Sequence, residues 1–134
     1  MTLVPVEAEK NTKNVVLKIN LMEFTLSKKD KKTARSIIEK GLLTEYENGL
    51  RSCDAVLQQW KNKATGNREA YMQLYDTIFK CDKHIARRYN SITGSKYLHI
   101  IAAQLYDSVI SEDDLKELSE VAKQIVKMWA DFNK

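Results

Sequence analysis

The segment 96–110 carries almost no charge, and this restricts the fold more than any other feature of the sequence. Between Lys96 and Glu112 the only formally charged residue is Asp107. At helical spacing the apolar residues of this segment point to every side, so a helix here must be covered by neighbours all round. The segment is also shorter than the ~20 apolar residues that a membrane-spanning helix needs. We therefore predict a buried central helix around which the rest of the chain packs.

Other segments repeat apolar residues every three or four positions, as amphipathic helices do. The clearest stripes are Tyr46, Leu50, Cys53, Leu57 and Trp60, and Tyr71, Leu74, Ile78, Cys81, Ile85 and Tyr89. Three capping-box pairs mark helix starts: Ser27 and Asp30, Thr44 and Glu47, and Ser111 and Asp114. Gly41 is predicted to end the first of these helices. Because short loops join antiparallel helices, the prediction is an all-α fold, a compact bundle of four to five antiparallel helices.

The N-terminal part is less regular. Residues 14–26 alternate apolar and polar side chains as a strand does, but they also contain a helical stripe. A lone strand in a helical chain has no partner unless a second copy supplies one, which favours helix and leaves strand as the alternative. Residues 1–13 contain the only proline, Pro5, and are expected to be a flexible leader. No linker divides the chain, so residues 1–134 are predicted to form one domain.

The formal net charge of +4 is concentrated in one stretch. Residues 27–40 hold six basic and two acidic residues, whereas the segments on either side each sum to zero. Cations at the start of a helix oppose its dipole, so they do not stabilise the helix and are candidates for phosphate contacts. An ordinary solvated helix face is the competing interpretation. The candidate residues are Lys28, Lys29, Lys31, Lys32 and Arg35.

A second basic face is expected on the helix at residues 68–90. Lys80, Lys83 and Arg87 lie together with His84 on its predicted solvent side, where they could follow a phosphate backbone. A helix-turn-helix protein places a polar or basic helix start in the DNA major groove, and no predicted helix of this chain begins that way. The sequence therefore predicts contacts to the nucleic-acid backbone alone. The alternative is that this is an ordinary solvated helix face.

Asp82 and Asp107 are carboxylates at predicted apolar positions. Asp82 falls in the middle of the apolar arc of its helix, and Asp107 interrupts the central helix. A buried carboxylate needs an ion pair or hydrogen bonds. We expect both side chains to be buried and paired, with Arg88 or Lys96 as the partner of Asp82. A catalytic acid at Asp82 is the functional alternative.

Residue types that carry catalysis or bind metals are few. Cys53 and Cys81 lie at predicted core positions and form no CxxC pair, and with His84 and His99 they give only scattered ligands. We therefore predict no metal site. The sequence has no Gly-rich phosphate loop, no GxSxG motif and no HExxH motif. We predict no cofactor and no small-molecule substrate, and we expect the protein not to be an enzyme.

The start of the chain gives no sign of export. Glu7 and Glu9 interrupt its first residues, which lack the apolar core of a secretory signal peptide. No stretch reaches the length of a membrane span. A cytoplasmic location is expected.

Apolar and aromatic residues are more numerous than one small bundle needs. The helix at residues 68–90 carries a second stripe, Met72, Tyr75 and Phe79, and residues 14–26 also need cover. A second copy of the chain or another protein partner would cover both. We therefore predict a non-enzymatic interaction or assembly module that self-associates. The alternative is a nucleic-acid-binding accessory protein that contacts phosphates through its basic helix faces.

Overall fold

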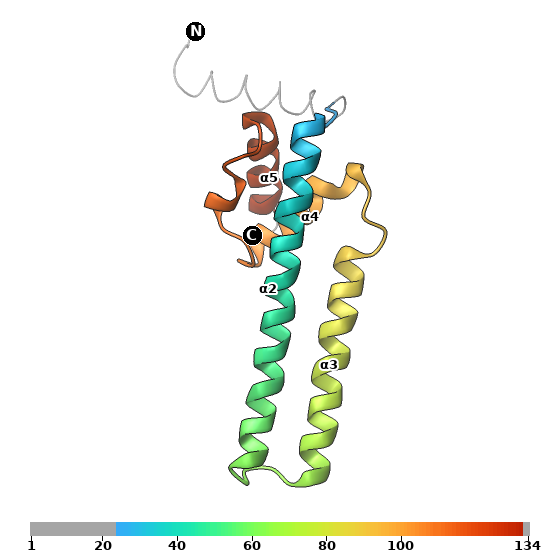
Figure 1. Cartoon of the computed structure of the whole chain (residues 1–134), viewed down its shortest axis with the longest axis vertical. Coiled ribbons are helices and arrows are strands. Elements are labelled where there is room, and N and C mark those ends of the chain that lie inside the picture. Colours follow the sequence, from blue (N-terminus) through green and yellow to red (C-terminus); the bar gives the residue numbers. More distant parts are fainter. Residues whose placement is uncertain (1–23, 133–134) are drawn as a thin grey trace.

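The computed structural model describes residues 24–132, which fold into a helical head and a protruding helical hairpin (Figure 1). No strand occurs within this range, and the predicted all-α class is confirmed. The predictions for residues 1–13 and for most of 14–26 lie outside the described residues. The elements are α2 (Lys28–Lys61), α3 (Asn67–Tyr89), η1 (Gly94–Lys96), α4 (Tyr97–Tyr106), η2 (Glu112–Leu115) and α5 (Glu120–Phe132), where η marks a 3-10 helix.

The head is built around α4, as the uncharged segment predicts. Its side chains Leu98, Ile100 and Ile101 are buried between α5 and the N-terminal half of α2. The helix is shorter than predicted and ends at Tyr106. Ser108 adopts a φ of 61°, which carries the chain out of the helix before the predicted end at residue 110.

A buried carboxylate joins the two ends of the head. Asp30, in the first turn of α2, accepts hydrogen bonds from the backbone N–H of Ser119 at 2.9 Å and from its hydroxyl at 2.6 Å. The backbone N–H of Asp30 donates to the Ser27 hydroxyl at 3.0 Å, so α2 starts where the sequence indicates. Ser119 accepts in turn from the N–H of Ala122. The Asp30 carboxylate of α2 therefore caps the start of α5 and ties it to the start of α2.

The predicted break at residues 41–44 is wrong, because α2 continues from Lys28 to Lys61. Gly41 is buried against α4, and a Cβ atom there would lie only 2.6 Å from Cδ of Gln104. Thr44 does not open a helix, since its hydroxyl donates to the carbonyl of Lys40 at 3.2 Å. Gly41 therefore lets two helices pack closely together, and it does not end a helix.

The capping box of Ser111 and Asp114 is present, but it opens η2, and α5 begins only at Glu120. Asp114 accepts from the backbone N–H of Ser111 at 2.8 Å and pairs with Lys40 of α2. The Lys40 ammonium, followed by the Ser111 N–H, lowers the pKa of Asp114. This pair ties the loop before α5 to α2.

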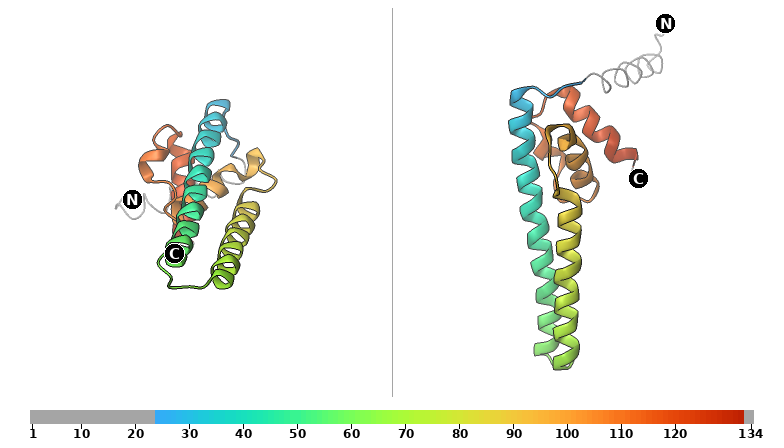
Figure 2. Two further views of the ribbon diagram at one scale, coloured as in Figure 1. Left: turned by 60° about the horizontal axis from the view of Figure 1, so that its bottom comes forward. Right: turned by 90° about the vertical axis from the view of Figure 1, so that its right-hand side faces the viewer.

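Beyond the head, α2 and α3 form an antiparallel hairpin (Figures 1 and 2). The limits predicted for the helix that corresponds to α3, 68–90, are confirmed to within one residue at each end. No other described element lies beside the tip half of the hairpin (Figure 1). Accordingly, Ala70 is the one residue of α3 that is buried.

Candidate interaction surface

The hairpin exposes large apolar side chains. We define its hairpin apolar face as six residues that are between 49% and 72% exposed. They are Leu43, Tyr46 and Leu50 of α2 and Tyr71, Tyr75 and Ile78 of α3. Met72 and Phe79 extend this surface around α3, and the rings of Tyr75 and Phe79 stack with centroids 6.4 Å apart.

Each helix concentrates its exposed apolar residues on one side. With 100° between successive residues, the three members on α2 fall within about 60° of one another, and so do the three on α3. Neither stripe is the one that joins the helices. The contact between them runs through Glu45, Gly49 and Cys53 of α2, with Gly49 packed against Cys81.

Two shallow pockets show that both stripes lie on the same side of the hairpin. One pocket of about 280 Å³ is lined by Leu57 and Tyr71. Leu57 lies on the same side of α2 as Leu50, and Tyr71 belongs to the stripe on α3. Another of about 250 Å³ is lined by Ser52 and Lys80, from the other side of each helix. The hairpin is therefore amphipathic as a unit, with one apolar and one polar face.

The head leaves the apolar face open. The residues by which α2 packs on α4 and α5 include Ala34 and Gly41, which lie more than about 120° around the helix from Leu43 and Leu50. The right-hand view of Figure 2 shows the head projecting to one side of α2. The head and the apolar face thus occupy opposite sides of this helix.

The sequence pattern assigns Tyr46, Leu50, Tyr71 and Ile78 to the core, and this assignment is wrong because each is about half exposed or more. Periodicity identifies the apolar side of a helix but not the number of neighbours that cover it. The sequence of α2 does contain a pattern that indicates its true contact with α3. Glu45, Gly49 and Cys53 recur every four residues and form the side that faces α3.

Buried polar groups join the hairpin to the head. Glu45 of α2 is 8% exposed and accepts hydrogen bonds from His84 Nε2 at 2.6 Å and Arg88 Nη1 at 3.1 Å, and from the Tyr89 hydroxyl. Gln104 of α4 donates through Nε2 to the Tyr89 hydroxyl at 2.9 Å. Three helices therefore meet in one hydrogen-bonded cluster, which fixes the direction of the hairpin.

The cluster shifts the pKa of two of its members. Burial raises the pKa of Tyr89, and the hydrogen bond to Glu45 adds to the effect. Burial opposes the charged form of Arg88, but the hydrogen bond to Asp107 and the charge of Glu45 together raise its pKa. The Tyr89 hydroxyl therefore stays protonated at neutral pH and keeps donating to Glu45.

The two candidate buried carboxylates lie at the surface. Asp107 pairs with Arg88, but its side chain is 37% exposed. Asp82 is exposed, so the prediction that its side chain is buried is wrong. It faces the open side of α3, which the sequence pattern treats as core. Neither Arg88 nor Lys96 forms an ion pair with Asp82 among the described residues.

The two basic stretches do not form one surface. On α2, Lys32 shares the side of the hairpin apolar face, whereas Lys80 and Arg87 lie on the polar side of α3. Lys31 packs near Gly94 of the head, and Lys80 pairs with Asp76 at 2.9 Å. The remaining candidates are exposed and form no ion pair within residues 24–132: Lys28, Lys29, Lys32, Arg35, Lys83 and Arg87.

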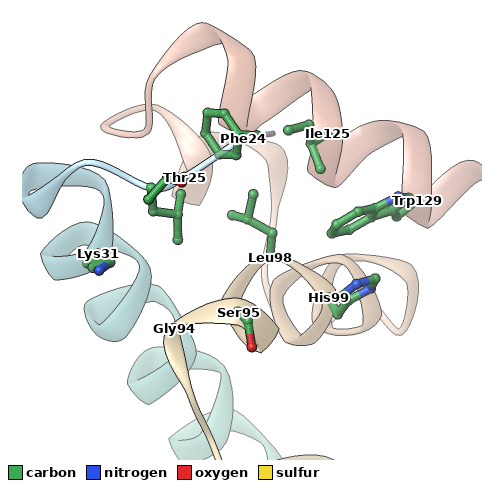
Figure 3. A pocket seen from close by; sticks show the side chains of 10 residues that line it. Phe24, Thr25, Lys31, Gly94, Ser95, Leu98, His99, Ile125 and Trp129 are labelled. Atoms are coloured by element: carbon green, nitrogen blue, oxygen red, sulfur yellow. The ribbon is translucent and has the colours of Figure 1, made fainter. Parts of the chain in front are cut away.

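The head contains a separate cavity of about 610 Å³ (Figure 3). Its walls include Leu98 and Trp129, with the ring of His99 stacked on Trp129 at a centroid distance of 3.8 Å. Lys31 supplies a cation, and no carboxylate occurs among the described residues that line it. The size is that of a small-molecule site, but its polar groups do not converge on one point.

The described part of the chain has two free cysteines and no group of metal-binding side chains. Cys53 and Cys81 are free, and burial followed by the proximity of Cys81 raises the pKa of the Cys53 thiol. A raised pKa keeps a cysteine unreactive. Within residues 24–132, no three His, Cys, Asp or Glu side chains gather in a group that could hold a metal. None of the helices there combines the length and the apolar character of a membrane span.

The described residues define an all-α protein in which a packed head carries an amphipathic hairpin. No protein-family model, curated protein or solved structure matches the chain.

Proposed function

We propose that this protein is an interaction module that self-associates through the hairpin apolar face. The observation that carries the proposal is an apolar surface spread over two helices, away from the packed head. Aromatic side chains present about 150–250 Å² each, so the exposed fractions here leave on the order of 800 Å² open. The largest apolar patch of a typical monomer is about 300–600 Å², whereas a stable interface takes about 800 Å² from each partner.

A second copy is the occupant that fits this surface. A two-helix face is half of a four-helix bundle, and two such faces related by a two-fold axis give each helix a second neighbour. Self-association would cover the same apolar surface on both chains at once. The polar faces and the heads would remain outside.

Analytical ultracentrifugation of the full chain between about 1 and 200 µM tests the proposal. The wild-type chain should sediment as a dimer at the upper end and dissociate on dilution. Leu50→Lys places a charge in the face and should weaken association at least about tenfold, because the ammonium would have to be desolvated. Ser52→Lys is the matched control on the polar side and should behave as wild type. A wild-type monomer throughout, or equal behaviour of the two variants, contradicts the proposal.

Phosphate contact is a secondary candidate. It is favoured by the exposure of four basic residues that form no ion pair within residues 24–132: Lys28, Lys29, Lys32 and Arg35. Backbone binding through these residues should weaken steeply between about 50 and 200 mM salt. Fluorescence anisotropy with labelled random single-stranded and duplex DNA measures it. An absence of binding at the lower salt concentration would end this candidate.

We also propose a cytoplasmic location, which the free Cys53 and Cys81 support because a reducing compartment keeps thiols unpaired. Fractionation of the source cells should recover the protein with cytoplasmic markers. Recovery in a membrane or exported fraction would contradict it.

A further inference from the structure

We propose that two copies pair antiparallel, with the tip of each hairpin beside the base of the other and a two-fold axis passing Leu50 and Ile78. This inference rests on the proposed self-association and specifies its geometry. In this arrangement Leu50 lies against Leu50 of the second copy, and Ile78 lies close to Ile78 of the second copy.

Apolar residues lie at the heptad interval on both sides of these two residues. Leu43, Leu50 and Leu57 recur at the heptad interval along α2. Rotation about the proposed axis therefore places Leu43 against Leu57 of the second copy, and the reverse. On α3, Tyr71 and Ile85 flank Ile78 at the same interval.

One axis can serve both helices, because Leu50 and Ile78 lie within about a turn of the same level. Gly49 packs beside Cys81, where a Cβ would lie 3.4 Å from the sulfur. At the tip, Trp60 Nε1 donates to Asn67 at 2.8 Å. Leu50 precedes Lys61, the end of α2, by as many residues as Ile78 follows Asn67, the start of α3.

One pair of charges flanking the face, Glu39 and Lys61, is complementary in the antiparallel arrangement. Glu39 precedes Leu50 by as many residues as Lys61 follows it, and both share the helix side of Leu50 to within about 20°. Both are exposed and form no ion pair with another described residue. The two-fold axis brings Glu39 of each copy to Lys61 of the other, which gives two intermolecular ion pairs.

The parallel arrangement, with tip beside tip, is less favourable on the same grounds. It places Lys61 near Arg68 of the second copy, since these residues occupy the two helices at the tip. It also brings the basic stretches that begin at Lys28 to one end of the dimer. The antiparallel arrangement puts each stretch about 27 Å from the axis, measured from Lys32 at 1.5 Å per residue. The separation between the two stretches then exceeds several Debye lengths at physiological salt.

Disulfide cross-linking in a Cys53→Ala, Cys81→Ala background tests the arrangement, after ultracentrifugation has confirmed that this background still dimerises. Packed helix axes are about 8–10 Å apart, so facing Cα atoms at a two-fold axis come within about 3.5–5.5 Å, a range that overlaps the Cα separation of a disulfide. Leu50→Cys should form a covalent dimer under mild oxidation, at a concentration where the chain is dimeric. Ser52→Cys, on the polar side, should not.

The outcomes separate this inference from the proposed function. A dimer in which Leu50→Cys fails to cross-link with itself, but cross-links with Ile78→Cys of a second chain, is parallel and overturns the arrangement while leaving self-association intact. A chain that stays monomeric overturns both.

A charge exchange provides a second readout that does not depend on cysteine. Glu39→Lys and Lys61→Glu should each weaken dimerisation by about two- to tenfold, which is the range of exposed ion pairs. The double variant restores both pairs with reversed sign and should return to near the wild-type affinity. A double variant as weak as the sum of the two single changes would overturn the antiparallel register.

Discussion

At the residue scale, Gln104 shows why a glycine stands inside α2. Its side chain has no exposed surface, and Nε2 donates to the carbonyl of Ile38 at 3.0 Å and to the Tyr89 hydroxyl. Its Oε1 has no hydrogen-bond partner among the described residues. A side chain this confined can approach α2 only where the helix lacks a Cβ, which is at Gly41.

Gly41→Ala is therefore expected to destabilise the protein, against the usual gain of about 1 kcal/mol when alanine replaces glycine inside a helix. The new methyl group would displace Gln104 from its two hydrogen bonds, for a net loss of about 1–3 kcal/mol. Gly49→Ala is the matched control, because its Cβ would lie at ordinary contact distance from Cys81. Urea unfolding at fixed protein concentration compares them. Equal stabilisation by both substitutions would contradict the packing argument.

Asp114 gives a pH-dependent prediction. Because its folded pKa is lowered, its contribution is present above the ordinary aspartate pKa of about 3.9 and is lost as the pH falls through the folded pKa. Asp114→Asn should lower stability by about 0.5–1 kcal/mol at pH 7. The difference from wild type should vanish in acid. Asp113→Asn, with a side chain 81% exposed, should show neither effect, and thermal unfolding across the pH range would reveal any departure.

At the scale of elements, local signals located most helix starts and missed the length of α2. Ser27 and the Ser111–Asp114 pair act through residues close to them in sequence, so the sequence alone predicts them. The role of Gly41 depends on Gln104 of another helix, which no local pattern contains. Asp82 was misplaced for a related reason, since an apolar arc does not reveal whether one helix or two will cover it.

The joint between hairpin and head is the element-scale feature with the clearest energetic consequence. Glu45→Gln removes the charge that accepts from Arg88, Tyr89 and His84 in a buried position. We expect a loss of about 2–3 kcal/mol in the free energy of unfolding. Glu47→Gln breaks only an exposed pair with Arg51 and should cost less than about 0.5 kcal/mol. Chemical denaturation measures the free energy of unfolding of both variants. Similar losses for the two would contradict the stabilising role of the Glu45 cluster between hairpin and head.

At the scale of the whole molecule, association through an apolar face predicts a characteristic response to salt. Raising sodium chloride from about 50 to 200 mM should change the dimer dissociation constant by no more than about threefold, whereas sodium sulfate should tighten it. Binding dominated by phosphate contacts would weaken by orders of magnitude over the same range. Sedimentation velocity in each salt measures the response. A tenfold loss of dimer in sodium chloride would show that charge, and not apolar burial, holds the copies together.

The hydrogen bonds between Asp30 and Ser119 span 89 positions of the chain, and this has a consequence for the order of folding. The hairpin contacts, such as that of Trp60 with Asn67, join residues that leave the ribosome close together in time. Contacts near in sequence form fast, and distant ones must wait for the rest of the chain. During synthesis the hairpin can therefore form while the head is still open. Its apolar face would then be available before α5 closes the head, so under the proposed self-association the hairpins of two neighbouring nascent chains would pair during synthesis.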